Sequence, residues 1–232
     1  VLRYTLRQDD ISNIRQGASR FVIEQEGKTL SSSVAQDIIY DRRDDRFDPT
    51  EGYFIRLGNE FAGLGGDLHY VRNRLGGGVY YSVVDDWIVS LTAEVGYVVG
   101  LGEQVRIQNR YSVGGDNLRG FASSGIGPRD RITRDALGGN QYYTGSAEMT
   151  FPTPFPKELG LRGSVFADVG SLWHVEGKDV DVVDTAALRA SVGVGALWRS
   201  PFGPIRISVA KPILKESFDR TEILRFSFGS RF

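Results

Sequence analysis

Few residues of this 232-residue chain could carry chemistry. It has no cysteine and only 2 histidines, His69 and His174, which excludes a disulfide framework, a thiolate zinc site and a cysteine nucleophile. Neither histidine has a nucleophile elbow or a Ser–His–Asp set beside it, so we interpret both as incidental polar residues. No phosphate loop or metal-ligand spacing occurs. The sequence therefore predicts no enzyme, no cofactor and no metal site.

Charge and hydropathy exclude further classes of protein. The 28 Lys and Arg nearly balance the 29 Asp and Glu, leaving a net charge of −1, so no global field recruits nucleic acid. No apolar run is long enough to cross a bilayer as a helix. Two carboxylates, Glu148 and Asp168, are the residue types of a glycosidase or phospholipase pair, but nothing else in the chain supports that chemistry.

One polar motif lies in the connection formed by residues 102–138. It reads Gly114-Gly115-Asp116-Asn117-Leu118-Arg119-Gly120-Phe121 and is followed by Gly125-Ile126-Gly127-Pro128-Arg129. The connection is far longer than a hairpin needs, and such loops are usually functional or disordered. Taken alone, an Arg-Gly-Phe tripeptide is equally typical of a glycine turn with a solvated arginine.

Ten segments of alternating apolar and polar residues surround this loop. The 29 glycines and 11% aromatic residues indicate an all-β chain. The segments cover approximately residues 1–9, 31–42, 52–62, 67–83, 87–101, 139–151, 159–173, 186–199, 203–213 and 222–232. Most are longer than the ~5–6 residues of a soluble strand, and a tilted strand crosses a bilayer in about 9–11 residues.

The two faces of these segments differ in character. One face carries Leu, Val, Ile and Ala with aromatic residues near the segment ends, and the other carries Arg, Glu and Asp with many Gly and Ser. That arrangement fits an antiparallel transmembrane β-barrel with lipid outside, water inside and aromatic girdles at the interfaces. A soluble two-sheet sandwich or a lipocalin-like barrel has the same period and stays open as an alternative.

The connections alternate in length. All the long ones, 10–30, 102–138 and 174–185, lie at one end of the predicted sheet, and short turns lie at the other. Outer-membrane barrels show this asymmetry, with short periplasmic turns and longer outer loops. In the first long connection, Ile14, Ala18, Phe21 and Val22 share a face and predict a short helix within residues 14–24.

On this motif and on further segments, the chain resembles the BamA family of outer-membrane assembly proteins, in its alphaproteobacterial branch. The segments occur in the family's order, one of them upstream of the loop, and the resemblance covers nearly the whole chain. These segments are residues 45–52, 136–140, 148–155 (Glu-Met-Thr-Phe-Pro-Thr-Pro-Phe), 166–170 (Phe-Ala-Asp-Val-Gly), 198–204 and the terminal Phe.

The resemblance implies that the long loop folds back into the barrel lumen and docks its arginine on acidic residues of the wall. The matching residues are Leu118, Arg119, Gly120 and Phe121 for the motif, with Glu148 and Asp168 as partners. The alternation also places Asp168 on a polar face. Two carboxylates beside one guanidinium would form charge-assisted, bidentate bonds. The alternative is that both carboxylates only line a wet lumen.

The terminal segment resembles the C-terminal targeting signal of outer-membrane proteins. It alternates aromatic residues through Phe226 and Phe228 and ends at Phe232, and such signals are read by strand addition. Gly229 permits a kink near the end of the strand. In the family, the matching glycine lets the last strand bend inward and unpair, which makes a weak seam and a lateral gate.

The family's barrel has sixteen strands and an N-terminal arm of POTRA domains. We therefore expect residues 1–232 to be the C-terminal part of an outer-membrane β-barrel of the bacterial surface antigen type, with about ten strands present and the arm and first strands absent. The segment is expected to keep the curvature of a larger barrel, although ten strands could also reclose into a smaller one.

The resemblance implies a function in the outer membrane of Gram-negative bacteria. The chain would belong to a membrane insertase that folds β-barrel proteins and inserts them through the weak lateral seam. Its implied partners are the lipid bilayer, unfolded outer-membrane client proteins and assembly-complex lipoproteins, the last mainly through the arm. The alternative is a protein-translocating pore of the related two-partner secretion or TamA type, which shares the Arg-Gly-Phe loop.

Overall fold

The computed structural model describes residues 1–176, 180–200 and 203–229 and consists almost entirely of one antiparallel sheet. Its ten strands lie in the order β1-β2-β3-β4-β5-β7-β8-β10-β11-β12. The strands are β1 (Leu2–Ile11), β2 (Gly27–Asp41), β3 (Gly52–Gly66), β4 (Tyr70–Val84), β5 (Trp87–Gly100), β7 (Gln141–Pro152), β8 (Leu161–Trp173), β10 (Arg189–Ser200), β11 (Gly203–Leu214) and β12 (Leu224–Phe228). All ten predicted segments are therefore confirmed as strands of one sheet.

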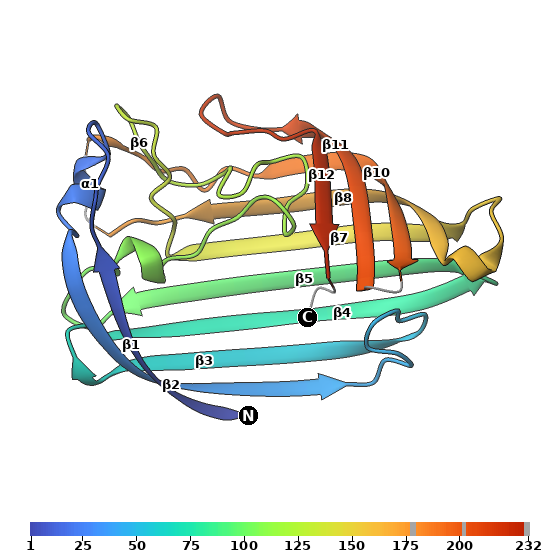
Figure 1. Ribbon diagram of the computed structural model, residues 1–232, viewed down its shortest axis with the longest axis horizontal. Coiled ribbons are helices and arrows are strands. Elements are labelled where there is room, and N and C mark those ends of the chain that lie inside the picture. The colour runs from blue at the N-terminus through green and yellow to red at the C-terminus, as the bar shows by residue number, and fades with distance from the viewer. Residues whose placement is uncertain (177–179, 201–202, 230–232) are drawn as a thin grey trace.

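The sheet curls like the wall of a barrel. Figure 1 shows β1 and β2 at one end and β10 to β12 at the other crossing in front of the central strands, with the long loop between them. Within the described residues, β1 pairs only with β2 and β12 only with β11, so these two strands are the edges. The expected curved wall is therefore present without pairing between its edges.

The outward face of the wall is apolar and exposed. Side chains that point outward from the strands remain accessible to solvent in large numbers; examples are Leu91, Val95, Val165, Val192, Val194, Ile207 and Val209. A soluble sandwich would bury such a face against a second sheet, whereas a barrel in lipid presents it to acyl chains. Alternation fails locally at Ala190 and Ser191, which are both buried at a register shift between β10 and β11.

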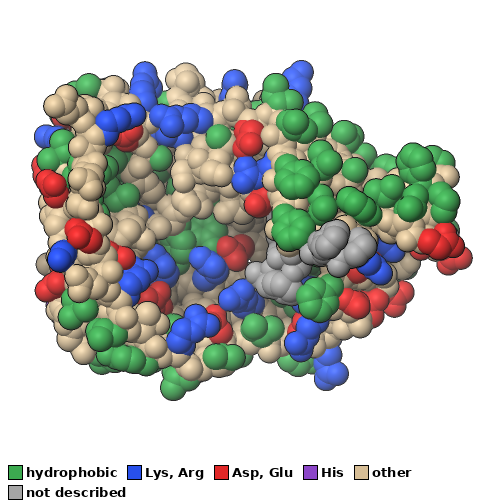
Figure 2. All heavy atoms as spheres, in the orientation of Figure 1, with side chains coloured by type: hydrophobic (Ala, Val, Ile, Leu, Met, Phe, Trp, Pro, Cys, Tyr) green, Lys and Arg blue, Asp and Glu red, His purple; other side chains and the backbone are tan. Residues whose placement is uncertain are grey.

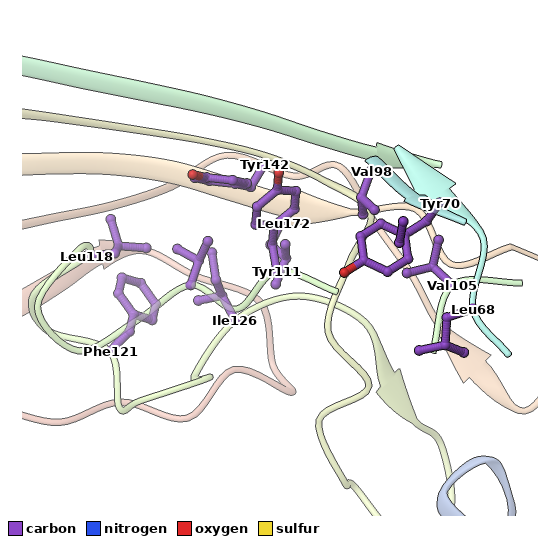
Figure 3. Close-up of a cluster of buried hydrophobic side chains, with 12 residues drawn as sticks. Leu68, Tyr70, Val98, Val105, Tyr111, Leu118, Phe121, Ile126, Tyr142 and Leu172 are labelled. Carbon is purple, nitrogen blue, oxygen red and sulfur yellow. The ribbon is translucent and has the colours of Figure 1, made fainter. Parts of the chain in front are cut away.

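The long loop fills the concave side of the wall. Its apolar side chains pack against inward-facing residues of β4, β5, β7 and β8, and Figure 3 shows this cluster. The loop contributes Val105, Tyr111, Val113, Leu118, Phe121 and Ile126, and the wall contributes Tyr70, Val98, Tyr142 and Leu172. The rings of Tyr111 and Tyr142 lie 4.5 Å apart. The protein thus has a buried core inside the wall, although the outer face stays exposed.

Smaller elements cover the loop end of the wall. The helix α1 (Arg20–Ile23) lies within the predicted range 14–24, and the 3-10 turns η1 (Ile107–Asn109) and η2 (Lys157–Leu159) occupy other connections. A second sheet of two short strands, β6 (Arg129–Asp130) and β9 (Val182–Val183), joins two long connections and was not predicted. Within the described ranges, no helix is long and apolar enough to cross a membrane.

Candidate functional site

The centre of the loop is an arginine that the wall almost completely encloses. Arg119 is 1% exposed, and so is Asp168 on β8. The guanidinium donates from Nε to Oδ2 and from Nη2 to Oδ1 of Asp168, each over 2.7 Å. The backbone N–H of Arg119 also donates to Oδ2 of Asp168, at 3.1 Å. The pair is bidentate, the strongest geometry available to an arginine and a carboxylate.

A second carboxylate completes the charge balance. Glu148 on β7 accepts a 3.1 Å hydrogen bond from Nη1 of Arg119. It also accepts bonds of 3.0 and 2.8 Å from Nη1 of Arg206 on β11. Two arginines therefore face two carboxylates, and the cluster is neutral. Burial alone would lower the pKa of Arg119, but Asp168 and Glu148 outweigh it and raise that pKa, so the loop arginine stays charged.

Neutral groups fix the orientation of the Arg119 side chain. The guanidinium carbon lies 3.3 Å from the ring centre of Phe166, an inward-facing residue of β8, and stacked arginines gain cation–π attraction. Ser146 accepts a 2.9 Å bond from Nη2 of Arg119 and donates a 2.7 Å bond to Asp168. Ser191 on β10 donates its hydroxyl to the carbonyl of Arg119. Contacts from three strands thus hold one loop residue.

The glycine of the motif lets the loop backbone approach the wall. Gly120 has a φ of +90°, a conformation that L side chains rarely adopt, and a Cβ at this position would lie 3.0 Å from Cβ of Ser191 and 3.4 Å from Cβ of Ala210. The next residue, Phe121, is fully buried, as is Leu118 on the other side of the arginine. All four motif residues therefore contact the wall or the core.

The loop is also joined to the connection between β11 and β12. The backbone N–H of Glu222 donates to the carbonyl of Gly120 at 3.0 Å, and that of Ala122 donates to the carbonyl of Arg220 at 2.9 Å. Phe121 and Thr221 form an isolated antiparallel bridge. The motif therefore contacts the connection that leads into the terminal strand.

The same loop reaches the other side of the wall. Ser19, which caps α1, donates from Oγ to Asp130 at 2.6 Å and from its backbone N–H to Asp135 at 2.9 Å. Burial would raise the pKa of Asp130, but hydrogen bonds from Ser19 and from backbone N–H groups lower it below its usual value. Arg7 on β1 donates to the Asn109 side chain at 2.9 Å. One loop thus links the regions beside both edge strands.

A cavity of about 1360 Å³ lies inside the wall beneath the docked loop. Its lining includes Glu148 and Arg206 of the charge cluster, Asp116 of the loop, and Ser227 and Gly229 at the terminal strand. Figure 2 shows the hollow in the middle of the molecule with basic and acidic side chains gathered in it. The lining is polar and mixed in sign, as expected for the water-filled interior of a barrel.

The predicted seam residues lie at the exposed edge of the sheet. Phe226 and Phe228 of β12 point outward and are 63% exposed. Gly229 follows the strand with a φ of +100°, which a side-chain-bearing residue would rarely adopt. Phe232, the last predicted seam residue, lies outside the described residues, so the terminal strand is described only through Phe228.

The structure brings Arg119, Glu148 and Asp168 together and adds partners that were not predicted. Arg206 and Phe166 are the most consequential of these. The alternation of β11 predicts that Arg206 lies on the polar face. Its contact with Glu148 on β7 depends on the curvature of the sheet, which the pattern of a single strand does not predict. His69 and His174 remain apart from this cluster. Among the described residues, no group of His, Asp and Glu is arranged to hold a metal ion.

Comparisons with known proteins agree with this architecture. The BamA outer membrane protein assembly factor of Neorickettsia risticii is 38% identical over 233 residues, covering 100% of this chain and 31% of that protein. The human sorting and assembly machinery component 50 homolog is 26% identical, with 96% of this chain and 50% of that protein covered. These relatives are named as assembly proteins, so they do not favour the alternative of a secretion pore.

A solved structure has the same fold. The crystal structure of BamA from Haemophilus ducreyi lacking POTRA domains 1–3 matches with a TM-score of 0.77 at 27% identity, over 88% of this chain and 43% of that one. This chain thus spans less than half of the structure it matches and about a third of the Neorickettsia relative. The family model of the Omp85 superfamily domain matches residues 1–232. Because that match covers every residue, the chain belongs to the Omp85 superfamily, as part of an outer-membrane β-barrel of the BamA type.

Proposed function

We propose that this chain is the barrel part of an outer-membrane protein assembly factor. In this proposal, unfolded β-barrel proteins are folded and inserted into the membrane through a weak lateral seam beside β12. Membership of the Omp85 superfamily supports the assembly role, as do the names of the bacterial and human relatives.

The observation that carries the seam is the unpaired outer edge of the terminal strand. Within the described residues, β12 pairs with β11 from Ile205↔Phe228 to Val209↔Leu224, and no described strand pairs with its other side. Backbone bonds from Ala210 N–H to Ile223 and from Gly229 N–H to Pro204 continue the pairing with β11 at both ends. An edge strand offers unpaired N–H and C=O groups to another strand. Strand addition at such an edge is a general way to bind an extended peptide.

The proposed work requires no catalytic residue. A client strand must pair its backbone before it enters lipid, because unpaired N–H and C=O groups are costly there. An unpaired strand edge and local thinning of the bilayer would lower that barrier. The Arg119 cluster would hold the loop and brace the curved wall while the edge exchanges partners.

The proposed partners follow from this role. The bilayer contacts the exposed apolar face of the wall, and unfolded outer-membrane proteins supply the strands that pair at the seam. Assembly-complex lipoproteins would act mainly through an arm of POTRA domains. These partners are part of the proposal and are tested with it.

The experiment places a photo-activated cross-linking residue on β12 and on an interior strand of the complete protein in its native membrane. Phe228 is the test position, and Val192 on β10 is the matched control, because both side chains face outward but β12 is an edge strand and β10 is an interior strand. The expected result is capture of nascent outer-membrane proteins from position 228 and not from 192. Equal capture at the two positions, or none at 228, would contradict the seam.

A second readout separates assembly from secretion. After capture and release, the client should resist extraction from the membrane by urea and should migrate as a heat-modifiable folded barrel. A client recovered beyond the membrane in soluble form would instead support a translocating pore.

A further inference from the structure

A second carboxylate of the loop contacts the terminal strand. Asp116 lies three residues before Arg119 and outside its charge cluster. Its Oδ1 accepts a 2.7 Å bond from Nε of Arg225 and a 2.5 Å bond from the hydroxyl of Ser227. Arg225 and Ser227 are both on β12, and the loop that carries Asp116 lies more than 100 residues earlier in the chain. One carboxylate oxygen thus binds two side chains of the edge strand.

These two donors occupy alternate positions, so they share the inward face of β12. The outward face carries Leu224, Phe226 and Phe228, which are all exposed. A slip of one residue along β11 would turn both donors toward lipid, because side chains alternate with a period of two.

A slip of two residues keeps the faces but changes the partners. Asp116 would then face Ile223 and Arg225 in one direction, or Ser227 and Gly229 in the other. Only the observed register, in which Ile207 opposes Phe226, presents both donors to the same carboxylate.

We infer that Asp116 is a positioning residue that sets the register of the terminal strand on β11. The backbone ladder between two strands repeats every two residues, so its hydrogen bonds alone do not distinguish the observed register from a two-residue slip, and the bonds to Asp116 supply that distinction. The use of this register in client insertion rests on the proposed function, whereas the register itself does not.

The surroundings of Asp116 hold the contact in place. Arg225 also donates to Glu222 at 2.7 Å and to Ser123, another loop residue, at 3.3 Å. Its guanidinium lies against Gly115, where an added Cβ would be 2.7 Å from Nη2 and where φ is +69°. The loop backbone therefore leaves space for the arginine of β12, and the two segments fit each other as one unit.

The test measures register directly with disulfides. Residues 1–232 contain no cysteine, so paired cysteines can be placed on the outward face of β11 and β12 in the complete protein in its native membrane, with any cysteine elsewhere in that protein replaced by serine. The pair Ile207→Cys with Phe226→Cys reports the observed register, and Ile207→Cys with Leu224→Cys reports a two-residue slip. Directly opposite residues come within disulfide range, whereas diagonal ones do not.

The inference predicts that Asp116→Ala lowers the yield of the 207–226 disulfide severalfold and raises that of 207–224. Asp116→Glu keeps an acceptor and restores much of the 207–226 yield. Asp10→Ala, which removes an exposed carboxylate from the opposite edge strand, leaves both yields unchanged. If Asp116→Ala does not assemble into the membrane, the double variant Arg225→Met with Ser227→Ala, which removes both donors of the contact, carries the same measurement.

Unchanged yields of both disulfides in Asp116→Ala, or in the double variant that replaces it, would overturn the inference. Client insertion measured in the same cells separates it from the proposed function. A shifted register with normal insertion would support the register role and show that client insertion does not use this register. An insertion defect with an unshifted register would overturn the register role.

Discussion

Arg119 and Asp168 form a bidentate ion pair with two 2.7 Å bonds, and both residues are 1% exposed. The pair joins a loop to the middle of a strand 49 residues later in the chain. A buried charge is tolerated only when it is paired and hydrogen-bonded. Each member of the pair therefore makes the burial of the other possible, and the docked loop depends on both.

Arg119→Ala is expected to destabilise the folded barrel by about 3–5 kcal/mol, because it leaves Asp168 and Glu148 buried with one cationic partner fewer. The loop should become sensitive to protease within residues 102–138. The temperature at which the compact, heat-modifiable band disappears on a gel measures the first effect, and limited proteolysis in detergent measures the second. Unchanged heat stability and unchanged cleavage would show that Arg119 does not brace the wall.

Arg119→Lys is the matched control for charge. A lysine ammonium is a point charge, so it cannot reproduce the bidentate hydrogen bonding to Asp168 or the stacking on the Phe166 ring. Heat stability should therefore fall between the values of the wild type and of Arg119→Ala. Full stability in the lysine variant would mean that charge alone, without the bidentate geometry, holds the loop.

The two carboxylates should contribute differently to the free energy of unfolding. Asp168 accepts hydrogen bonds from two side-chain nitrogens and the backbone N–H of Arg119, and from Ser146. Glu148 accepts one hydrogen bond from Arg119 and also pairs with Arg206. Asp168→Asn is expected to lower the free energy of unfolding by about 3 kcal/mol or more. Glu148→Gln should cost less because Arg119 keeps Asp168. The order is checked by thermal melts of the two variants, and a reversed order would contradict the assignment of Asp168 as the main partner.

Arg206 should act only through Glu148. Its side chain is 27% exposed to the cavity, so solvent screens much of its charge, and Arg206→Gln is expected to cost about 1 kcal/mol or less. Because the two residues share one interaction, the double variant with Glu148→Gln should be no less stable than Glu148→Gln alone. A double-mutant cycle on heat stability measures this. Additive losses would indicate a separate role for Arg206.

The turn between β2 and β3 should be sensitive to acid. Burial would raise the pKa of Asp44, but hydrogen bonds from Thr50 and from the backbone N–H of Glu51 lower it well below its usual 3.8. The lowered pKa means that the charged form stabilises the turn above about pH 3.8 and that this contribution is lost as the pH falls through the folded pKa.

Hydrogen exchange of the amides in residues 43–51 measures this effect as the pH falls. Exchange in Asp44→Asn should be faster than in the wild type near neutral pH, and the difference should disappear in strong acid. A difference that stays constant with pH would show that the Asp44 charge does not stabilise the turn.

The period of two was sufficient to predict the wall, because a barrel in lipid repeats the same alternation on every strand. It placed Asp168 inward and Phe226 outward. It failed at Ala190 and Ser191, where a register shift buries two successive side chains. A bulge of this kind depends on the pairing with the neighbouring strand, so the residue pattern within β10 does not predict it.

The loop motif predicted the docking residues only through the family resemblance. The residues themselves were equally consistent with a solvated arginine in a glycine turn. The partners Arg206 and Phe166 depend on the curvature of the sheet. The short strands β6 and β9 have 2 residues each, too few for any period to appear. Contacts between distant segments were thus the part that the sequence left open.

The most direct test of the account is a covalent replacement for the Arg119 contacts. Phe121 and Thr221 lie directly opposite each other in an isolated antiparallel bridge, so Phe121→Cys with Thr221→Cys can join the loop to the connection before β12 by a disulfide. The measurement is client insertion by the complete protein carrying Arg119→Ala and this cysteine pair, before and after reduction. If Arg119 acts by holding the loop on the wall, insertion recovers when the disulfide forms and is lost again on reduction. A disulfide that forms fully without restoring insertion would contradict the account.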